Sequence, residues 1–184
     1  MEPERIIHPF DPVYDSYSEI LILGSLPSVK SRENNFYYGH PQNRFWKVLA
    51  AIFNDQVPQS IPEKTEFLLE NHIAVWDVIN SCVITGSSDS SIRDVQVNDL
   101  EELIENSCIK TIICNGKAAE KYYRKYQEKK TGIASLVLPS TSPANAAWSL
   151  EKLISVWKPS VLNSLSAEPL SDSSVQTGKE TTES

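Results

Sequence analysis

Two short segments of the sequence combine small residues, proline and hydroxyl groups in a way that could bind a ligand. Residues 24–28 read GSLPS and residues 139–145 read PSTSPAN, and each follows an apolar run. Glycine lets a backbone approach a bound group closely, and hydroxyls and free N–H groups bind phosphates and base edges. Each segment is also compatible with an ordinary turn between a strand and a helix, in which a serine caps the helix.

The elements that must position these segments alternate between strands and helices. Apolar runs and helical spacing predict strands at 19–23, 73–78, 111–114 and 133–138, and helices at 43–53, 63–71, 116–127 and 144–157. Asn98, with Glu101 three residues later, is predicted to cap a further helix, whereas residues 80–94 are predicted to form a loop. Pro159 is predicted to lie beyond the end of the last helix.

This alternation predicts an α/β fold, a three-layer sandwich with a central, mostly parallel sheet and helices on both faces. Ligands of such sheets bind beyond the carboxyl ends of the strands. Residues 24–28 and 139–145 each follow a predicted strand directly, so both segments are placed at that edge. We therefore expect them to lie close together in the folded chain.

The bulk composition is that of one globular domain. The chain has 184 residues, of which 40% are hydrophobic. From Ser164 onward large apolar residues are almost absent, so we expect a folded domain at 1–163 and a disordered tail at 164–184. The tail holds four carboxylates and one lysine, which leaves about −4 of the overall net charge of −7 for the domain. Such a domain can bind nucleic acid through a local basic patch, with weak and salt-sensitive affinity.

Cysteine usage and hydropathy argue against several classes of site and location. Cys82, Cys108 and Cys114 form no CxxC pair, so we expect reduced core thiols and neither a metal site nor an iron–sulfur cluster. No apolar stretch approaches the roughly 18 residues of a membrane span, and the acidic N-terminus is not a signal peptide. We expect a cytoplasmic monomer, associated with the nucleoid if the source is prokaryotic, that needs no cofactor and binds no membrane.

A third segment carries a resemblance to a known family. Residues 37–48 read YYGHPQNRFWKV, which is similar to the block that follows the first active-site motif of mismatch-specific uracil-DNA glycosylases. Residues 24–27 stand where that family has Gly-Ile-Asn-Pro, and residues 139–142 resemble its Pro-Ser-Gly motif. Residues 115–117 resemble its Leu-Gly-Lys turn. The similarity covers about residues 19–158 and implies a uracil-DNA glycosylase-like fold and a role in base excision repair of DNA.

One departure changes the substrate that the resemblance implies. Uracil-removing branches carry Asn or Asp in the first motif, where this chain has Leu26, which can neither position nor activate a water. The Gly-Ser-Leu-Pro motif with the later Tyr-Tyr-x-His-Pro-x-Asn block resembles the hypoxanthine-DNA glycosylase branch, in which the catalytic Asn comes from that block. The resemblance thus implies that Asn43 orients the attacking water through its amide oxygen. Asn43 could instead cap the helix that begins at Arg44, and one oxygen cannot serve both roles at once.

The resemblance also implies roles for the neighbours of Asn43. Tyr38 would stack on a flipped-out base or, alternatively, pack in the core. His40 would donate to the base or a phosphate, or serve only the turn at Pro41. The expected base-binding set is Gly24, Ser25, Leu26, Tyr38 and His40. The expected DNA-binding set is Ser28, Ser140, Thr141, Ser142 and Asn145, of which Asn145 could also be an early residue of the last helix. Charged side chains that could contact phosphates, or simply face solvent, are Arg44, Lys47, Lys117, Arg124, Lys125, Lys129 and Lys130.

The reaction implied is hydrolysis of the N-glycosidic bond of deoxyinosine, with DNA that contains a deaminated base as the partner. It needs a flipped-out nucleotide, a positioned water and hydrogen-bond donors for the departing purine. Neither 24–28 nor 139–145 contains a lysine, so we expect a monofunctional enzyme without a Schiff-base step. Three alternatives stay open: a uracil or G·T/G·U mismatch glycosylase, a catalytically inactive DNA-binding relative, and a nucleotide-binding protein unrelated to repair. The last is disfavoured because the chain lacks GxGxxG and P-loop motifs.

Overall fold

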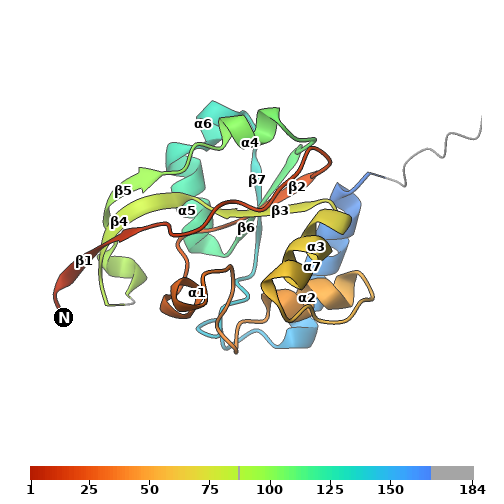
Figure 1. The fold of residues 1–184 in the computed structure, drawn as a ribbon, viewed down its shortest axis with the longest axis horizontal. Helices are drawn as coiled ribbons and strands as arrows, with labels where there is room; N and C mark the ends of the chain where they lie inside the picture. The colour runs from red at the N-terminus through yellow and green to blue at the C-terminus, as the bar shows by residue number, and fades with distance from the viewer. Residues whose placement is uncertain (87, 167–184) are drawn as a thin grey trace, which may run out of the picture.

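The computed structural model describes residues 1–86 and 88–166 and contains the parallel sheet that the sequence predicts (Figure 1). The sheet has the order β3-β2-β6-β7, and all its neighbouring strands run parallel. The strands are β2 (Ile20–Gly24), β3 (Ile73–Asp77), β6 (Thr111–Asn115) and β7 (Ser135–Leu138). The carboxyl ends of all four strands therefore meet at one edge of the sheet.

Alternation along the strands divides the core into two layers. Ile20 and Ile22 of β2 point into one cluster of buried residues, and Leu21 and Leu23 point into the other. One face is covered by α2 (Phe45–Ile52), α3 (Ile61–Glu70) and α7 (Leu150–Ser164). The other is covered by α4 (Glu101–Glu105) and α5 (Lys117–Tyr126), with α6 (Glu128–Thr131) beside them.

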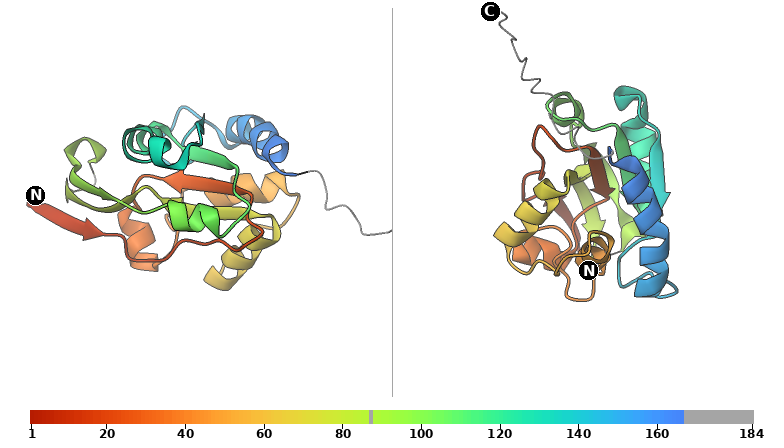
Figure 2. Two further views of the ribbon diagram at one scale, coloured as in Figure 1. Left: turned by 90° about the horizontal axis from the view of Figure 1, so that it is seen from above. Right: turned by 90° about the vertical axis from the view of Figure 1, so that its right-hand side faces the viewer.

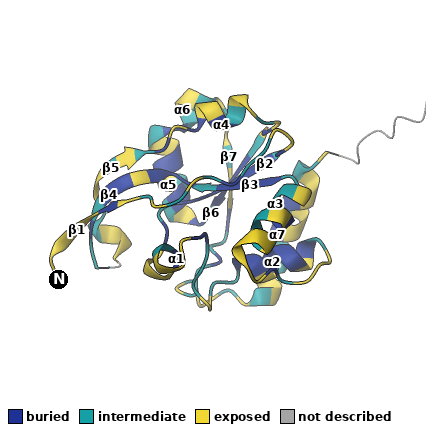
Figure 3. Cartoon of the chain, viewed as in Figure 1, coloured by how far each residue is buried: buried dark blue, intermediate teal, exposed yellow. Residues whose placement is uncertain are grey.

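The two groups of helices lie on opposite sides of the parallel strands in Figure 1, and Figure 2 gives the same arrangement from two further directions. Burial is concentrated in the central strands and on the inward sides of the helices (Figure 3). The predicted three-layer α/β architecture is confirmed. None of the helices in the described residues is long and apolar enough to cross a membrane.

A second sheet, which the sequence did not predict, flanks the first. It is antiparallel, with the order β1-β4-β5, and consists of β1 (Pro3–Ile7), β4 (Ile79–Thr85) and β5 (Arg93–Val97). The prediction of a loop at 80–94 was therefore wrong for most of its length; only the short helix η1 (Asp89–Ser91) and its flanks connect the strands. Asn80, Ser81 and Thr85 dilute the apolar signal of β4, but Cys82 and Ile84 are buried. Pairing with the distant N-terminal segment makes this stretch a strand.

Two predictions about helix ends were also wrong. The last helix begins at Leu150, where Ser149 accepts a hydrogen bond from the Lys152 amide, and it continues through Pro159 to Ser164. The helix continues because the burial of Trp157 and Val161 in the core offsets the loss of the backbone hydrogen bond that Pro159 cannot donate. Asn98 caps no helix: its amide group donates to the carbonyl of Asp77, 2.8 Å away.

The C-terminal boundary differs slightly from the predicted one. Ser164 belongs to α7, Leu165 packs against the core, and the Ser166 backbone N–H donates to Glu19 Oε1 over 3.0 Å. The remainder of the predicted tail, residues 167–184, lies outside the described residues. Leu165 and Ser166 thus contact the rest of the fold beyond the predicted boundary at residue 163, and the position of the boundary stays a prediction.

A pair of truncations tests this boundary. Removing residues 167–184 should leave the melting temperature nearly unchanged, because the segment has almost no large apolar residues to contribute to a core. Removing residues 165–184 should lower it by about 2–4 °C, the shift expected from about 1 kcal/mol in a domain of this size. Thermal unfolding of both proteins measures the difference. Equal melting temperatures would mean that Leu165 and Ser166 add nothing to the fold.

Candidate active site

A cavity of about 1050 Å³ opens beyond the carboxyl ends of the parallel strands. Its walls come from residues 24–29 after β2, residues 115–118 at the end of β6, and residues 137–145 around the end of β7. Tyr38 and Asn43, from the segment between α1 (Val29–Asn34) and α2, complete it. The segments that the sequence analysis singled out thus meet at one site, which is large enough for a nucleotide.

A chain of side-chain hydrogen bonds joins three of these segments. Asn115 Nδ2 donates to Thr141 Oγ1 over 3.0 Å, and the Thr141 hydroxyl donates to Asn43 Oδ1 over 2.9 Å. Asn115 Oδ1 also accepts from the Thr141 backbone N–H at 3.0 Å. We call this chain the Asn115–Thr141–Asn43 relay. It fixes the loop after β7 to the end of β6 and to the start of α2.

The relay determines which part of the Asn43 carboxamide is free. Asn43 Oδ1 accepts from the Phe45 backbone N–H at 3.0 Å as well as from Thr141. Both lone pairs of a carboxamide oxygen are then in use, so this oxygen cannot also accept a proton from water. α2 begins at Phe45 with Arg44 as its N-cap, so Asn43 lies one residue before the cap, where its side chain accepts from the first helical N–H and supports the start of the helix. The Nδ2 group of Asn43 therefore remains free to donate a hydrogen bond to a ligand in the cavity.

Thr141 lines the cavity, but it is fully buried and its hydroxyl and N–H are already bound to Asn43 and Asn115, so its predicted phosphate contact stays a prediction. The sequence could not separate it from Ser140 and Ser142, because all three are small hydroxyl residues in one turn. Arg44 was also predicted as a candidate phosphate contact. Its guanidinium instead donates to carbonyls of the loop after β7, at 2.9 Å to Ser142 and 3.1 Å to Asn145, and also to Trp148.

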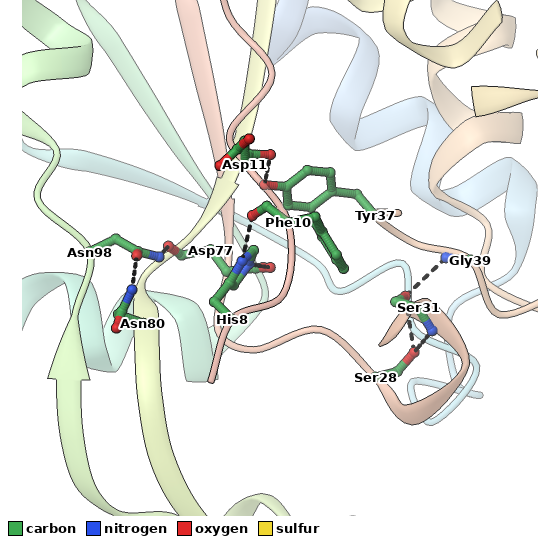
Figure 4. Close-up of polar contacts among 10 residues, drawn as sticks. All are labelled: His8, Phe10, Asp11, Ser28, Ser31, Tyr37, Gly39, Asp77, Asn80 and Asn98. Carbon is green, nitrogen blue, oxygen red and sulfur yellow. Dashed lines mark hydrogen bonds and ion pairs between the residues drawn. The ribbon is translucent and has the colours of Figure 1, made fainter. Parts of the chain in front are cut away.

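A buried acid–histidine pair connects the wall of the cavity to the N-terminal segment, and the sequence had pointed to neither residue. His8 Nε2 lies 2.8 Å from Asp77 Oδ2, and the two side chains are only 3% and 4% exposed. Asp77 ends β3 and lines the cavity, whereas His8 follows β1, close to Phe10 and Tyr37 (Figure 4). Asp77 is the last residue of the buried strand β3, and a carboxylate at the carboxyl end of a parallel strand was the signal that could have drawn attention to it.

Tyr38 lies next to this pair with one ring face already occupied. Its ring stacks on Phe45, with centroids 3.9 Å apart and planes inclined by 22°. Burial, and to a lesser extent the Asp77 carboxylate, raise the pKa of the Tyr38 hydroxyl, so it stays protonated at any working pH. Its backbone φ of 52° is unusual for a residue with a side chain. The ring can offer only its second face to a ligand.

Comparisons with known proteins agree with this geometry. The family model of the uracil DNA glycosylase superfamily matches residues 12–161. The chain belongs to the uracil DNA glycosylase superfamily. Two relatives, each named hypoxanthine DNA glycosylase, come from Methanosarcina acetivorans and Methanosarcina barkeri and are 39% and 37% identical. The matches cover 76% and 74% of this chain and 89% and 86% of the relatives.

A solved structure supports the same fold. It is a solution NMR structure of a Methanosarcina acetivorans protein assigned to the uracil DNA glycosylases, with a TM-score of 0.70 and 34% sequence identity. The match covers 84% of this chain and 98% of that one. The superfamily assignment thus rests on sequence and structure together.

Most of the other predicted residues line the cavity of this superfamily member. Gly24, Ser25 and Leu26 form one wall, and Ser140, Ser142 and Asn145 another. Several have local partners: Ser28 caps α1, Ser140 Oγ accepts from the Ser142 amide, and Asn145 Nδ2 donates to the Ser140 carbonyl. His40 Nδ1 accepts from the Gln42 amide at 3.0 Å, so the turn role is present and its Nε2–H remains available to a ligand.

The described residues contain no cluster of three or more His, Cys, Asp or Glu side chains arranged to hold a metal ion. Cys82 and Cys114 are buried free thiols, and burial raises the pKa of Cys114 to about 12, so it is not a ready nucleophile. Cys108, in contrast, is exposed, so the prediction of a core thiol was wrong for this residue.

The contacts of Arg44 predict how the loop after β7 responds to substitution. Arg44→Lys should lower the free energy of unfolding by about 1.5–3 kcal/mol, because one ammonium cannot reach carbonyls that a planar guanidinium reaches together. Lys47→Ala, at an exposed position of the same helix, should change it by no more than about 0.5 kcal/mol. Chemical denaturation measures both. An Arg44→Lys protein as stable as the Lys47→Ala protein would contradict the role of Arg44.

Proposed function

We propose that the chain is a monofunctional DNA glycosylase that hydrolyses the N-glycosidic bond of deoxyinosine and releases hypoxanthine from DNA. The observation that carries the proposal is the convergence of GSLPS, the Asn43 block and PSTSPAN on one nucleotide-sized cavity. The two hypoxanthine DNA glycosylases, similar over most of their length, support the choice of base. Leu26 supports it too, since it lines the cavity where uracil-removing branches carry a polar residue.

The cavity offers groups for each need of the reaction. The free face of Tyr38 would support the ring of the extrahelical base, a contact worth roughly 1–3 kcal/mol. Asn43 would act through its Nδ2 group, which donates to the attacking water or to the sugar, while its oxygen stays bound in the relay. Ser142 and Asn145, whose carbonyls accept from Arg44, would contact the phosphates on either side of the lesion together with Ser140. A rigid loop holds the nucleotide out of the stack without reordering during the reaction.

An abasic-site assay tests the proposal against its alternatives. Four duplexes that differ only at one position carry deoxyinosine, deoxyuridine, a G·T mismatch or no lesion. We expect abasic product from the deoxyinosine duplex, and an intact strand until alkali is added. Release from deoxyuridine or the G·T mismatch alone would favour the alternative enzymes, and release from none would favour an inactive relative.

The same assay tests the mechanism. Lys117 lines the cavity but is exposed, and we assign it no bond to the sugar. Excess EDTA should leave the rate unchanged, because the residues assigned to the reaction include no metal ligand. Borohydride should trap no covalent complex with DNA, since no Schiff base forms. A trapped complex that disappears in Lys117→Ala would overturn the monofunctional mechanism.

Substitutions of Asn43 separate its two roles. Asn43→Ala should slow single-turnover excision of hypoxanthine by about a hundredfold or more and lower stability by about 1 kcal/mol through loss of the bond that supports the start of α2. Asn43→Asp keeps the oxygen that accepts from Phe45 and Thr141 but has no Nδ2 group. It should therefore keep stability and remain as slow as Asn43→Ala. Rapid excision by Asn43→Asp would mean that Asn43 acts by accepting a proton, against the geometry described above.

A further inference from the structure

The side of the cavity next to the antiparallel sheet has no part in the function proposed so far. It is lined by Ile84 of β4, by Gly86 just after that strand, and by Asp89 of η1. The cavity volume of about 1050 Å³ lies above the roughly 300–1,000 Å³ of pockets that enclose a drug-sized ligand. A nucleotide bound between Tyr38 and Asn43 therefore leaves room on this side for a further part of the substrate.

Arg32 of α1 brings a positive charge to the same side of the cavity. Arg32 lines the cavity. Burial raises the pKa of the Cys82 thiol, and the charge of Arg32 partly opposes this rise, so the guanidinium lies near β4. Cys82 and Ile84 are both buried and lie two residues apart on β4, so they share one face of the strand. The guanidinium is thus close to the wall that Ile84 forms.

The charge of Arg32 is not compensated within residues 1–86 and 88–166. Its Nε is buried without a hydrogen-bond partner, and none of the ion pairs among these residues includes Arg32. Asp89 lines the same side of the cavity, but it is exposed and does not pair with Arg32. A guanidinium stays charged at any working pH, and a partly buried charge without a partner is unfavourable. An anion in the cavity would supply the missing partner.

The position of Arg32 is fixed by the contacts of α1. The neighbouring Ser31 is buried, and its hydroxyl accepts from the Gly39 backbone N–H over 3.0 Å (Figure 4). Asn34 Nδ2 donates to the Gly39 carbonyl, also over 3.0 Å. These bonds tie α1 to the segment that leads to α2. A side chain on an element held in this way loses less freedom when it binds a ligand.

We propose that Arg32 binds a phosphate of the DNA strand that carries the lesion, on the side of the cavity next to the antiparallel sheet. The inference rests on the proposed function and adds a contact from outside the segments that carry that function. The phosphate contacts proposed above all come from the loop after β7, so they hold the strand from one wall only. A guanidinium can donate two parallel hydrogen bonds to a phosphate. Contacts from two walls hold the extrahelical nucleotide in one position.

Affinity, its salt dependence and stability together test this role. The probe is a duplex carrying 2′-fluoro-deoxyinosine, which resists cleavage, and its affinity is measured at several salt concentrations. Arg32→Met should weaken binding about tenfold or more, the loss expected for a hydrogen bond to a charged group. The slope of log affinity against log salt should become shallower by about 0.9, the share of one phosphate. The melting temperature should not fall, because Arg32 forms no ion pair within the described residues and its buried Nε has no partner to lose.

Two further variants serve as controls. Arg32→Lys keeps the charge, so it should keep the wild-type salt slope. It should still bind more weakly than the wild type, because an ammonium cannot donate the two parallel hydrogen bonds. Lys30→Met removes an equal charge from the same helix, but Lys30 is exposed, pairs with Glu33 over 3.1 Å and does not line the cavity. Its affinity and salt slope should change much less than those of Arg32→Met.

Neutral phosphates locate the contact. In a series of duplexes, the phosphates near the lesion are replaced one at a time by a methylphosphonate. With the wild type, one position should weaken binding about as much as Arg32→Met does. With Arg32→Met, the same position should have no further effect, because the effects of removing two partners of one contact do not add. Additive effects at every position would contradict the inference.

The remaining results bear on separate claims. A wild-type protein that binds the duplex but releases no base from deoxyinosine contradicts the proposed function, and the salt slopes still decide the inference. Excision by the wild type, with affinity and salt slope unchanged in Arg32→Met, contradicts the inference alone. A melting temperature lowered equally by Arg32→Met and Asp89→Asn would mean that these two side chains pair with each other, which also contradicts the inference.

Discussion

The site depends on the Asn115–Thr141–Asn43 relay, because it ties together three segments that are far apart in the sequence. Thr141 is fully buried, and its hydroxyl both accepts from Asn115 and donates to Asn43. A valine or alanine there could make neither bond, and the loop after β7 would lose its register against α2. Arg44 adds a second connection of the same kind, from its guanidinium to the carbonyls of that loop. The loop after β7 is thus held in place by polar contacts to β6 and to the start of α2.

The relay also divides the polar groups of the cavity into donors and acceptors. With its oxygen bound, Asn43 offers only N–H groups, and the Tyr38 hydroxyl stays protonated because burial raises its pKa. Asp77, whose second oxygen is bound to His8, offers only an acceptor. Donors and acceptors held in fixed orientation cost little reorganisation when a ligand binds.

Local sequence patterns predicted the parallel sheet well. Runs such as 20–24 and 111–115 are buried on both faces and need no information from distant residues. The antiparallel sheet was missed because β4 is recognisable only through its pairing with β1, more than 70 residues earlier. The same distinction applies to the site. Its loops could be located from composition. The roles of the buried Thr141 hydroxyl, the Arg44 guanidinium and the His8–Asp77 pair could not be predicted, because they depend on contacts between segments that are distant in the sequence.

The central claim is that this cavity receives the extrahelical purine of deoxyinosine. The most direct test is a crystal structure of the protein with duplex DNA that carries 2′-fluoro-deoxyinosine, whose glycosidic bond resists cleavage. We expect hypoxanthine in the cavity, with one ring face on Tyr38 and C1′ within one water of Asn43 Nδ2. A base that stays stacked in the duplex, or that lies outside the cavity, would contradict this expectation.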